Sequence, residues 1–173
     1  TIYWRARKDG SHEVAELTYA LSQFFRLSLS EGRDYITVQE EVQLADLYLR
    51  LQQIRFPDRL AFEIAVDDAV RGLQIPKLIL QPLVENAVIH GIEPLQESGL
   101  IQIRAALDNG DLVLTVADNG VGFDAATVDR GFALNNIRER LELVYRQQAT
   151  FDVHSTPGLG TQVTVRIPVA AKE

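Results

Sequence analysis

The sequence contains no cysteine and no methionine, and it has no long apolar run. Without cysteine, the chain has no disulfide framework, no thiolate metal site and no cysteine nucleophile. No apolar run approaches the roughly 18 residues of a membrane-spanning helix, and no secretory signal peptide is visible. We therefore expect no membrane contact by these residues. Because a complete gene product starts with methionine, a chain that starts at Thr1 is expected to be a piece of a longer protein.

Basic residues are fewer than acidic residues. The chain has 17 Lys and Arg against 24 Asp and Glu, which gives a net charge of −7. A nucleic-acid binder needs a basic face that displaces counterions, so nucleic acid is not expected as a partner. A hydrophobic fraction of 46% supports a folded core. The length of 173 residues then suits one domain of ordinary size with a small helical appendage.

Two segments in the first third of the chain carry apolar residues at alternating spacings of three and four, the pattern of a helix packed against another helix. The spacing predicts helices over 12–29 and 38–56, with Gly32 in the connecting turn. Thr37-Val-Gln-Glu40 is a capping box at the start of the second helix. A simple helical hairpin explains the pattern, and its exposed seam favours a four-helix dimer. The two seams are Val14, Leu17, Leu21, Phe24 and Ser28, and Leu44, Leu47, Leu51 and Ile54.

After Pro57 the spacing of apolar residues predicts both strands and helices. Alternating residues predict a half-buried strand over 60–66. Pro76 is expected to open a helix that runs to about His90 and ends at Gly91. The remaining predicted elements are strands over 100–108 and 111–117 joined by an Asn109-Gly110 hairpin turn, a helix over 133–147, and strands over 150–155 and 162–167.

This order of elements predicts an α+β fold. Residues 1–56 are expected to form the helical hairpin, a helical dimerisation region. Residues 57–173 are expected to form an α/β sandwich, with a mixed, mostly antiparallel sheet and helices on one face.

Asn86 and His90 lie four residues apart on the predicted helix that Pro76 opens, on one face and one turn from each other. The helix is otherwise strongly apolar and therefore largely buried. In one interpretation the two residues, with Glu85 beside them, are a polar stripe on a buried helix. In the other, Asn86 offers its amide oxygen to Mg²⁺, which binds through one or two protein groups plus substrate phosphates. His90 then faces the phosphate chain.

Asp118-Asn-Gly-Val-Gly122 follows an apolar strand. A carboxylate fixed there can accept a hydrogen bond from an exocyclic amine such as that of adenine, worth about 1.5–3 kcal/mol. Gly120 and Gly122 allow the backbone to approach a flat base. An ordinary turn explains the same residues, because Asp-Asn-Gly is a common turn sequence.

Two further glycine clusters follow along the chain. Gly131-Phe-Ala-Leu134 precedes a predicted helix, and Gly158-Leu-Gly160-Thr161 precedes a predicted strand. Backbone amides at a glycine-rich helix start can hold phosphate oxygens. A loop hinge and a turn are the simpler interpretations of the two clusters. The functional interpretation therefore depends on the order in which all four motifs occur.

In that order, the motifs resemble the N, G1, G2 and G3 boxes of the ATPase superfamily that contains gyrase, the heat-shock chaperone of the Bergerat fold, histidine kinases and MutL. The sequences of 80–91 and 136–141 resemble one branch in particular, the LytS/YehU-like sensor histidine kinases. The helical segments Phe25–Leu29, Leu44–Tyr48 and Ile54–Phe56 also look like the dimerisation region of that branch.

The resemblance implies a Bergerat-fold domain that binds ATP and Mg²⁺ and transfers the γ-phosphate to a histidine. It implies that Asn86 coordinates Mg²⁺, and that Asp118 binds the adenine amine with Thr161 assisting through water. It further implies a homodimer in the full-length protein, a response regulator as partner, and the cytoplasmic portion of a membrane-anchored bacterial sensor. The implied catalytic residues are Glu85, Asn86 and His90, and the implied nucleotide contacts are Asn86, His90, Asp118, Gly120, Gly122, Gly131 in a mobile lid, Leu134, Gly158, Gly160 and Thr161.

Two features depart from the family pattern. Ala133 stands where the G2 box has glycine, which is expected to stiffen the lid or to alter phosphate contact. The phosphoacceptor motif of the family, Pro-His-Phe-Leu-Phe-Asn, is absent, and neither His12 nor His154 has that motif around it. We therefore expect the acceptor histidine to lie upstream, and this chain alone to be unable to phosphorylate itself.

Three other interpretations remain. A degenerate nucleotide-binding or docking module without kinase activity is supported by Ala133 alone. A methyltransferase is disfavoured because Asp124 replaces the third glycine of its loop, and because the Asn109-Gly110 hairpin conflicts with parallel crossovers. A serine kinase of the anti-sigma-factor type does not need the helical hairpin over 12–56.

Overall fold

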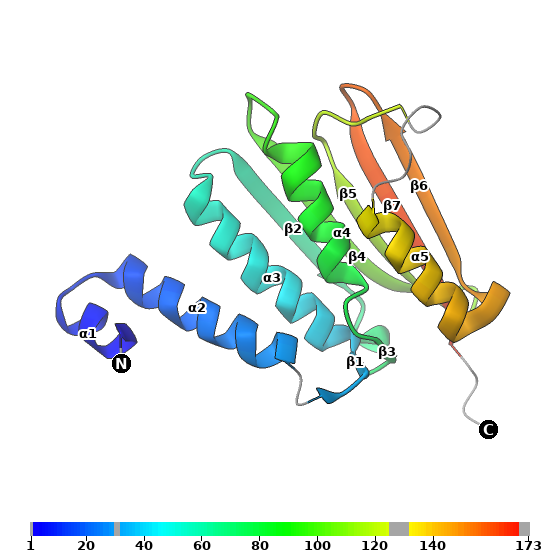
Figure 1. The fold of residues 1–173 in the computed structure, drawn as a ribbon, viewed down its shortest axis with the longest axis horizontal. Helices are drawn as coiled ribbons and strands as arrows, with labels where there is room; N and C mark the ends of the chain where they lie inside the picture. Colours follow the sequence, from blue (N-terminus) through cyan, green and yellow to red (C-terminus); the bar gives the residue numbers. More distant parts are fainter. Residues whose placement is uncertain (1, 30–31, 125–131, 170–173) are drawn as a thin grey trace.

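A five-stranded sheet, covered by helices on one face, forms the body of the molecule in the computed structural model, which describes residues 2–29, 32–124 and 132–169 (Figure 1). The strands lie in the order β2-β4-β5-β7-β6; β2 runs parallel to β4, and every other neighbouring pair is antiparallel. The predicted α+β class, with a mixed and mostly antiparallel sheet, is therefore confirmed. The strands are β2 (Leu60–Val66), β4 (Gly99–Asp108), β5 (Asp111–Asp118), β6 (Thr150–Thr156) and β7 (Gly160–Pro168).

The two faces of the sheet differ because side chains alternate along each strand. The face toward the helices is apolar and belongs to one continuous hydrophobic core. On the outer face, Gln102 donates to Glu63 at 2.7 Å, and Arg166 pairs with Asp108 at 2.7 Å. The inward-facing core residues of the central strands are Ile101, Ile103, Ala105, Leu112, Leu114, Val116, Val163, Val165 and Ile167.

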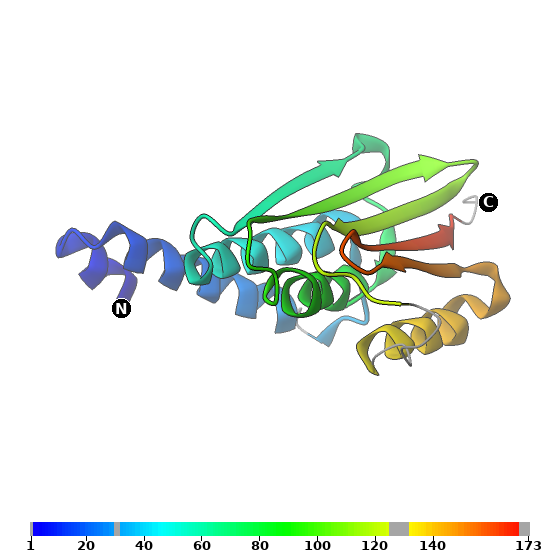
Figure 2. The same cartoon turned by 90° about the horizontal axis from the view of Figure 1, so that it is seen from above.

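The helices α3 (Val38–Arg55), α4 (Leu80–Asn86) and α5 (Phe132–Tyr145) lie side by side beneath the sheet, while α1 (Ile2–Lys8) and α2 (His12–Leu29) extend beyond its edge (Figure 2). This arrangement confirms the predicted helices over 12–29, 38–56 and 133–147. The short elements are β1 (Tyr35–Thr37), η2 (Asp68–Val70), β3 (Gln74–Pro76), η3 (Ala87–Ile92) and η4 (Arg146–Gln148).

Two local sequence signals have the predicted geometry. Glu40 N donates to Thr37 Oγ1 at 3.1 Å and Thr37 N donates to Glu40 Oε2 at 2.8 Å, which completes the capping box of α3. Asn109 and Gly110 both have positive φ, at 52° and 88°, as the two-residue turn between β4 and β5 requires.

Helix α3 contributes to the same core as the sheet. Its buried residues Val38, Val42, Ala45 and Leu49 belong to the continuous cluster that also contains the sheet residues. The predicted domain boundary after residue 56 follows a helix that is packed into this core, and it stays a prediction.

The predicted start of the helix over 76–91 is wrong. Residues Gln74–Pro76 form strand β3, which pairs antiparallel with β1, and α4 begins at Leu80. The φ of Leu78 is 63°, a left-handed conformation that an α-helix excludes, so no helix can run from Pro76 through this residue. The far end also differs, because after Asn86 the helix continues as the π-helical turn η3 to Ile92.

No helix in the described part of the chain has both the length and the apolar character needed to cross a lipid bilayer.

Candidate functional site

Asp118 and Thr161 lie side by side at the ends of two neighbouring strands. They are register partners in the β5–β7 pair, and both point toward the helices, as their buried neighbours Val116 and Val163 do. Directly opposed residues of an antiparallel pair have Cβ atoms about 4.5–5.5 Å apart. Thr161 is 7% exposed, and Asp118 is half-buried. The fold therefore places a carboxylate and a hydroxyl together at one end of the sheet.

The Asp118 carboxylate is held by backbone amides. Its Oδ1 accepts a hydrogen bond from Gly120 N at 2.9 Å. Burial raises the pKa of Asp118 above its ordinary value, and the amides of Gly120 and Thr161 partly offset that effect because they favour the anion. An ionised carboxylate only accepts hydrogen bonds, so this group is suited to a ligand that presents an N–H donor.

The end of the helical segment α4–η3 closes against this carboxylate through Gly91. A Cβ atom added to Gly91 would lie 2.6 Å from Asp118 Oδ1, and one added to Gly120 would lie less than 3.0 Å from the Gly91 backbone. Gly91 O also accepts from Val121 N at 3.1 Å. Two glycines are therefore needed for this close approach. The sequence predicts Gly91 only as a helix terminator, and its contact with the site was not anticipated.

The turn between β6 and β7 packs against the loop that follows Asp118. Gly158 N donates to Val121 O at 2.7 Å. Gly122 and Gly160 have positive φ, and a Cβ on either would lie less than 3.0 Å from backbone carbonyl oxygens, those of Thr156 and Asp118 respectively. The glycine clusters at 120–122 and 158–160 are therefore in contact.

Ser155 joins these two loops, and it was not among the residues predicted from the sequence. Its Oγ accepts from Phe123 N at 2.8 Å, donates to Gly160 O at 3.2 Å and lies 2.9 Å from Thr161 Oγ1. Strand alternation could have indicated it, because Ser155 falls on the inward face of β6 in register with Thr161. A polar residue at an inward position is uncommon enough to attract attention.

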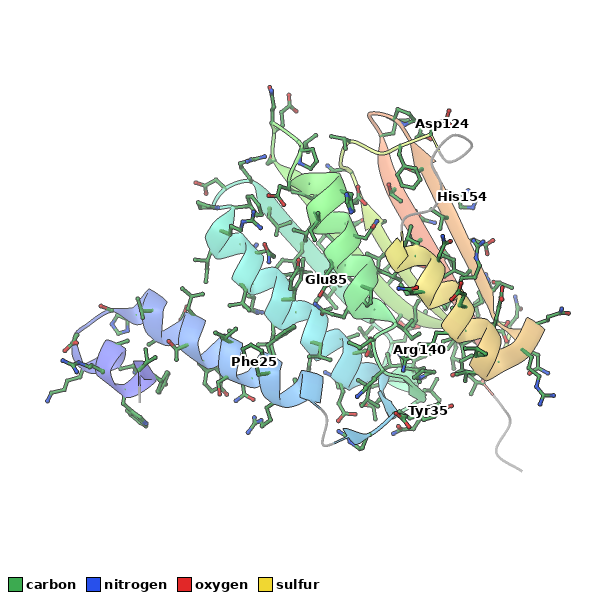
Figure 3. All side chains as sticks on the ribbon, in the orientation of Figure 1. Phe25, Tyr35, Glu85, Asp124, Arg140 and His154 are labelled. Atoms are coloured by element: carbon green, nitrogen blue, oxygen red, sulfur yellow. The ribbon has the colours of Figure 1, made fainter. Side chains whose placement is uncertain are left out.

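The residues predicted on the helix lie along α4 and η3. Asn86 is half-buried at the end of α4, and His90 is exposed on η3. Glu85 accepts from Gln81 Nε2 at 2.9 Å and lies on the side of α4 toward α3 (Figure 3). Burial raises the pKa of Tyr48 on α3 to about 12, and the charge of Glu85 adds to that effect. Single π-helical turns inside helices occur frequently at functional sites.

Two further predicted contacts belong to the glycine cluster at residues 131–134. Gly131 lies outside the described residues. Leu134 is 2% exposed, and its side chain belongs to the hydrophobic core. A surface groove of about 710 Å³ lies between α1, α2 and α3, and none of the predicted site residues lines it.

The sheet covered by helices on one face, with glycine-lined loops meeting at a strand-end aspartate, defines a nucleotide-binding α/β sandwich. Residues 71–171 match the model of the histidine kinase-, DNA gyrase B-, and HSP90-like ATPase family, and residues 1–60 match a histidine kinase model. The chain belongs to the histidine kinase-, DNA gyrase B-, and HSP90-like ATPase family, and its domain binds ATP.

The similar proteins include sensor histidine kinases. The chain is 36% identical over 172 residues to the sensor histidine kinase YesM of Bacillus subtilis, covering 97% of this chain and 30% of that protein. It is 37% identical over 171 residues to the sensor protein LytS of Staphylococcus haemolyticus, covering 91% of this chain and 29% of that protein. The chain thus spans less than a third of these relatives, and the resemblance to the LytS/YehU-like branch is confirmed.

Solved structures share the fold. The histidine kinase domain of a blue-light activated histidine kinase from Erythrobacter litoralis superposes with a TM-score of 0.61 at 20% identity, covering 96% of this chain and 80% of that one. The catalytic domain of histidine kinase ThkA superposes with a TM-score of 0.58 at 15% identity, covering 78% of this chain and 94% of that one.

Proposed function

We propose that this chain is the catalytic ATP-binding part of a two-component sensor histidine kinase, which supplies the γ-phosphate of ATP to a histidine in another segment of the same protein. The observation that carries the proposal is the position of Asp118 beside the buried Thr161, where Gly91 at the helix end and Gly120 in the following loop close around the carboxylate. That arrangement suits a flat base with an exocyclic amine.

The base is bound by the strand ends. Asp118 accepts a hydrogen bond from the adenine amine, and Thr161, held by Ser155 at 2.9 Å, assists through water. Gly120 and Gly122 form the wall of the base pocket, where a side chain would collide with neighbouring backbone. Gly158 and Gly160 support that wall from the β6–β7 turn.

The phosphate chain is bound along α4 and η3. Asn86 would hold a magnesium ion through its amide oxygen, together with phosphate oxygens, and the bound ion would neutralise phosphate charge. His90 faces the phosphates from the next turn. Glu85, fixed by Gln81, completes the predicted catalytic group. Gly131 and Leu134 remain predicted nucleotide contacts.

The rest of the mechanism belongs to the whole protein. The acceptor imidazole attacks the γ-phosphorus, the bond to the β–γ bridging oxygen breaks, ADP leaves, and the ring proton passes to solvent. The full protein is a homodimer that passes the phosphate to a response regulator. Residues 1–56 are part of its dimerisation region, residues 57–173 are its catalytic domain, and both lie in the cytoplasmic portion of a membrane-anchored sensor.

Calorimetric titration with ADP and ATP tests the base contact. Asp118→Asn replaces one acceptor oxygen by an NH₂ group that opposes the adenine amine, so we expect affinity to fall about tenfold or more. Asp111→Asn, the same change at the other end of β5, is the matched control and should bind as the parent does. Unchanged affinity in Asp118→Asn would contradict the assignment.

A transfer assay tests the reaction. The chain is mixed with γ-labelled ATP, with Mg²⁺ and with a second polypeptide that carries the phosphoacceptor motif of the family. We expect label on the second polypeptide and none on this chain alone. Nucleotide binding without transfer would indicate the alternative, a docking module without kinase activity.

A further inference from the structure

Glu41 is a carboxylate with no exposed surface, on helix α3. Its Oε2 accepts hydrogen bonds from Ile79 N at 3.1 Å and Leu80 N at 2.8 Å, and its Oε1 accepts from Leu78 N. Removing a carboxylate from water is costly unless hydrogen bonds compensate, and here three consecutive amides offset part of that cost. A side chain of α3 therefore holds the first residues of α4.

The start of α4 has no local cap of its own. Its N-cap residue is the apolar Ile79, whose side chain makes no capping bond. The first amides of a helix lack partners inside the helix and carry positive partial charge. Glu41 supplies the acceptors that an N-cap Ser or Asp normally supplies, although it precedes Leu80 by 39 residues.

The segment that Glu41 holds is the one that carries the phosphate side of the site. Asn86 and His90 follow Leu80 along α4 and η3, and Gly91 then touches Asp118. Helix α3 also holds the far end of this segment, where Arg55 forms an ion pair of 2.6 Å with Glu93. Both ends of α4–η3 are thus bound to α3, while the base-binding residues lie on strands.

We infer that Glu41 is a positioning residue for the nucleotide site: it fixes where α4 begins, and hence where Asn86 and His90 stand relative to Asp118. The inference rests on the proposed function and deepens it. Because Asp118 and Thr161 are held by the sheet, loss of Glu41 displaces the metal and phosphate contacts and leaves the base contacts in place.

The consequence is a selective loss of the metal-dependent part of nucleotide binding. The relevant quantity is the affinity for ADP with Mg²⁺ divided by the affinity for ADP with a chelator. In Glu41→Gln, one carboxylate oxygen becomes an NH₂ group that faces the amide donors of α4. We expect this ratio to fall at least fivefold, while the metal-free affinity changes less than twofold.

Glu40→Gln is the matched control. Glu40 is the neighbouring residue of α3, and its carboxylate serves the capping box and an ion pair with Arg33 at 2.8 Å. This variant weakens the start of α3 and leaves the contact with α4 intact, so its ratio should equal that of the parent. If the role of Glu41 were purely structural, Glu41→Gln would lower the melting temperature and leave the ratio unchanged, as Glu40→Gln does.

The parent protein and the variants test different claims. If the parent does not bind ADP, the proposed function fails; if it binds ADP and gains affinity from Mg²⁺, the variants decide the role of Glu41. An unchanged ratio in folded Glu41→Gln overturns the inference, and so does an equal loss of both affinities. If Glu41→Gln does not fold, the same ratio is measured for Glu41→Asp. Aspartate keeps the negative charge, but its shorter side chain moves the carboxylate away from the amides of α4.

Discussion

At the scale of single residues, the site depends on the absence of side chains as much as on their presence. Asp118 and Thr161 provide polar atoms, but Gly91 and Gly120 allow the helix end and the loop to meet at that carboxylate. Ser155 adds one hydroxyl that connects both loops to Thr161. Small changes at these positions should therefore weaken nucleotide binding.

Gly91→Ala tests the close approach. The added Cβ would lie 2.6 Å from Asp118 Oδ1 and 2.8 Å from its Cγ, so the carboxylate must move away from its place. We expect ADP affinity to fall about tenfold or more, which corresponds to about 1.4 kcal/mol. Gly72→Ala, where nothing lies within 4 Å of the added atom, is the control and should bind normally. Equal affinities in the two variants would show that the approach is not needed.

Ser155→Ala tests the hydroxyl that links the loops. The substitution leaves Phe123 N without its acceptor and frees the Thr161 hydroxyl, so we expect a loss of about 1–3 kcal/mol in stability. ADP affinity should fall several-fold in the same variant. Urea unfolding and calorimetry measure the two effects, and Thr156→Ala, an exposed neighbour on β6, provides the comparison. Normal affinity in Ser155→Ala would leave this residue a structural role only.

At the scale of elements, helix α3 connects the helical region with the nucleotide site. Its first turn is stabilised by Thr37 and Glu40, its buried face enters the core, and Glu41 holds the start of α4. The position at which α3 begins therefore affects its capping, its packing in the core and its contact with α4. A change at its N-cap should therefore affect the stability of the whole domain.

Thr37→Ala removes the side chain that accepts from Glu40 N. Loss of an N-cap hydroxyl costs about 0.5–2 kcal/mol, and we expect the free energy of unfolding to fall by that amount. Chemical denaturation measures the change. Thr37→Ser keeps the accepting oxygen and should restore most of the stability; if serine is as damaging as alanine, the hydroxyl is not the cause.

At the scale of the whole molecule, the fold retains buried carboxylates that the site requires. Burial raises the pKa of Asp118 and of Glu41, which means that the folded state favours their neutral forms. A group whose pKa is raised by folding adds stability below its unfolded pKa, and that contribution is lost as pH rises through the folded pKa. At neutral pH the ionised forms of these carboxylates are therefore less favourable for the folded state than their protonated forms would be.

The pH dependence of Asp118→Asn tests this conclusion. Because asparagine stays neutral, we expect the variant to melt at a higher temperature than the parent near pH 7, although it binds nucleotide more weakly. The difference should shrink as pH falls toward about 4, where Asp118 becomes protonated in both states. Thermal unfolding of both proteins without nucleotide, measured from neutral to acidic pH, checks the sign. A stability gain that grows on acidification would contradict it.

Features that depend on near neighbours along the chain could be predicted from the sequence alone. The helices over 12–29 and 38–56, the Thr37–Glu40 capping box and the Asn109-Gly110 turn follow from spacing and local hydrogen bonds, and all of them appear in the structure. The identity of the nucleotide site was also accessible, because its four motifs occur in the order of a known family. Their contacts with Mg²⁺ and ATP remain predictions.

The contacts between the helices, strands and loops of the site became visible only in the tertiary structure. Pro76 looks like a helix start in isolation, yet α4 begins at Leu80, where a carboxylate from α3 holds its amides. The roles of Gly91 and Ser155 likewise depend on atoms that are far away in sequence. Hydrogen bonds and close packing between distant segments leave no periodic pattern in the chain, so they become visible only when the sheet and helices are assembled.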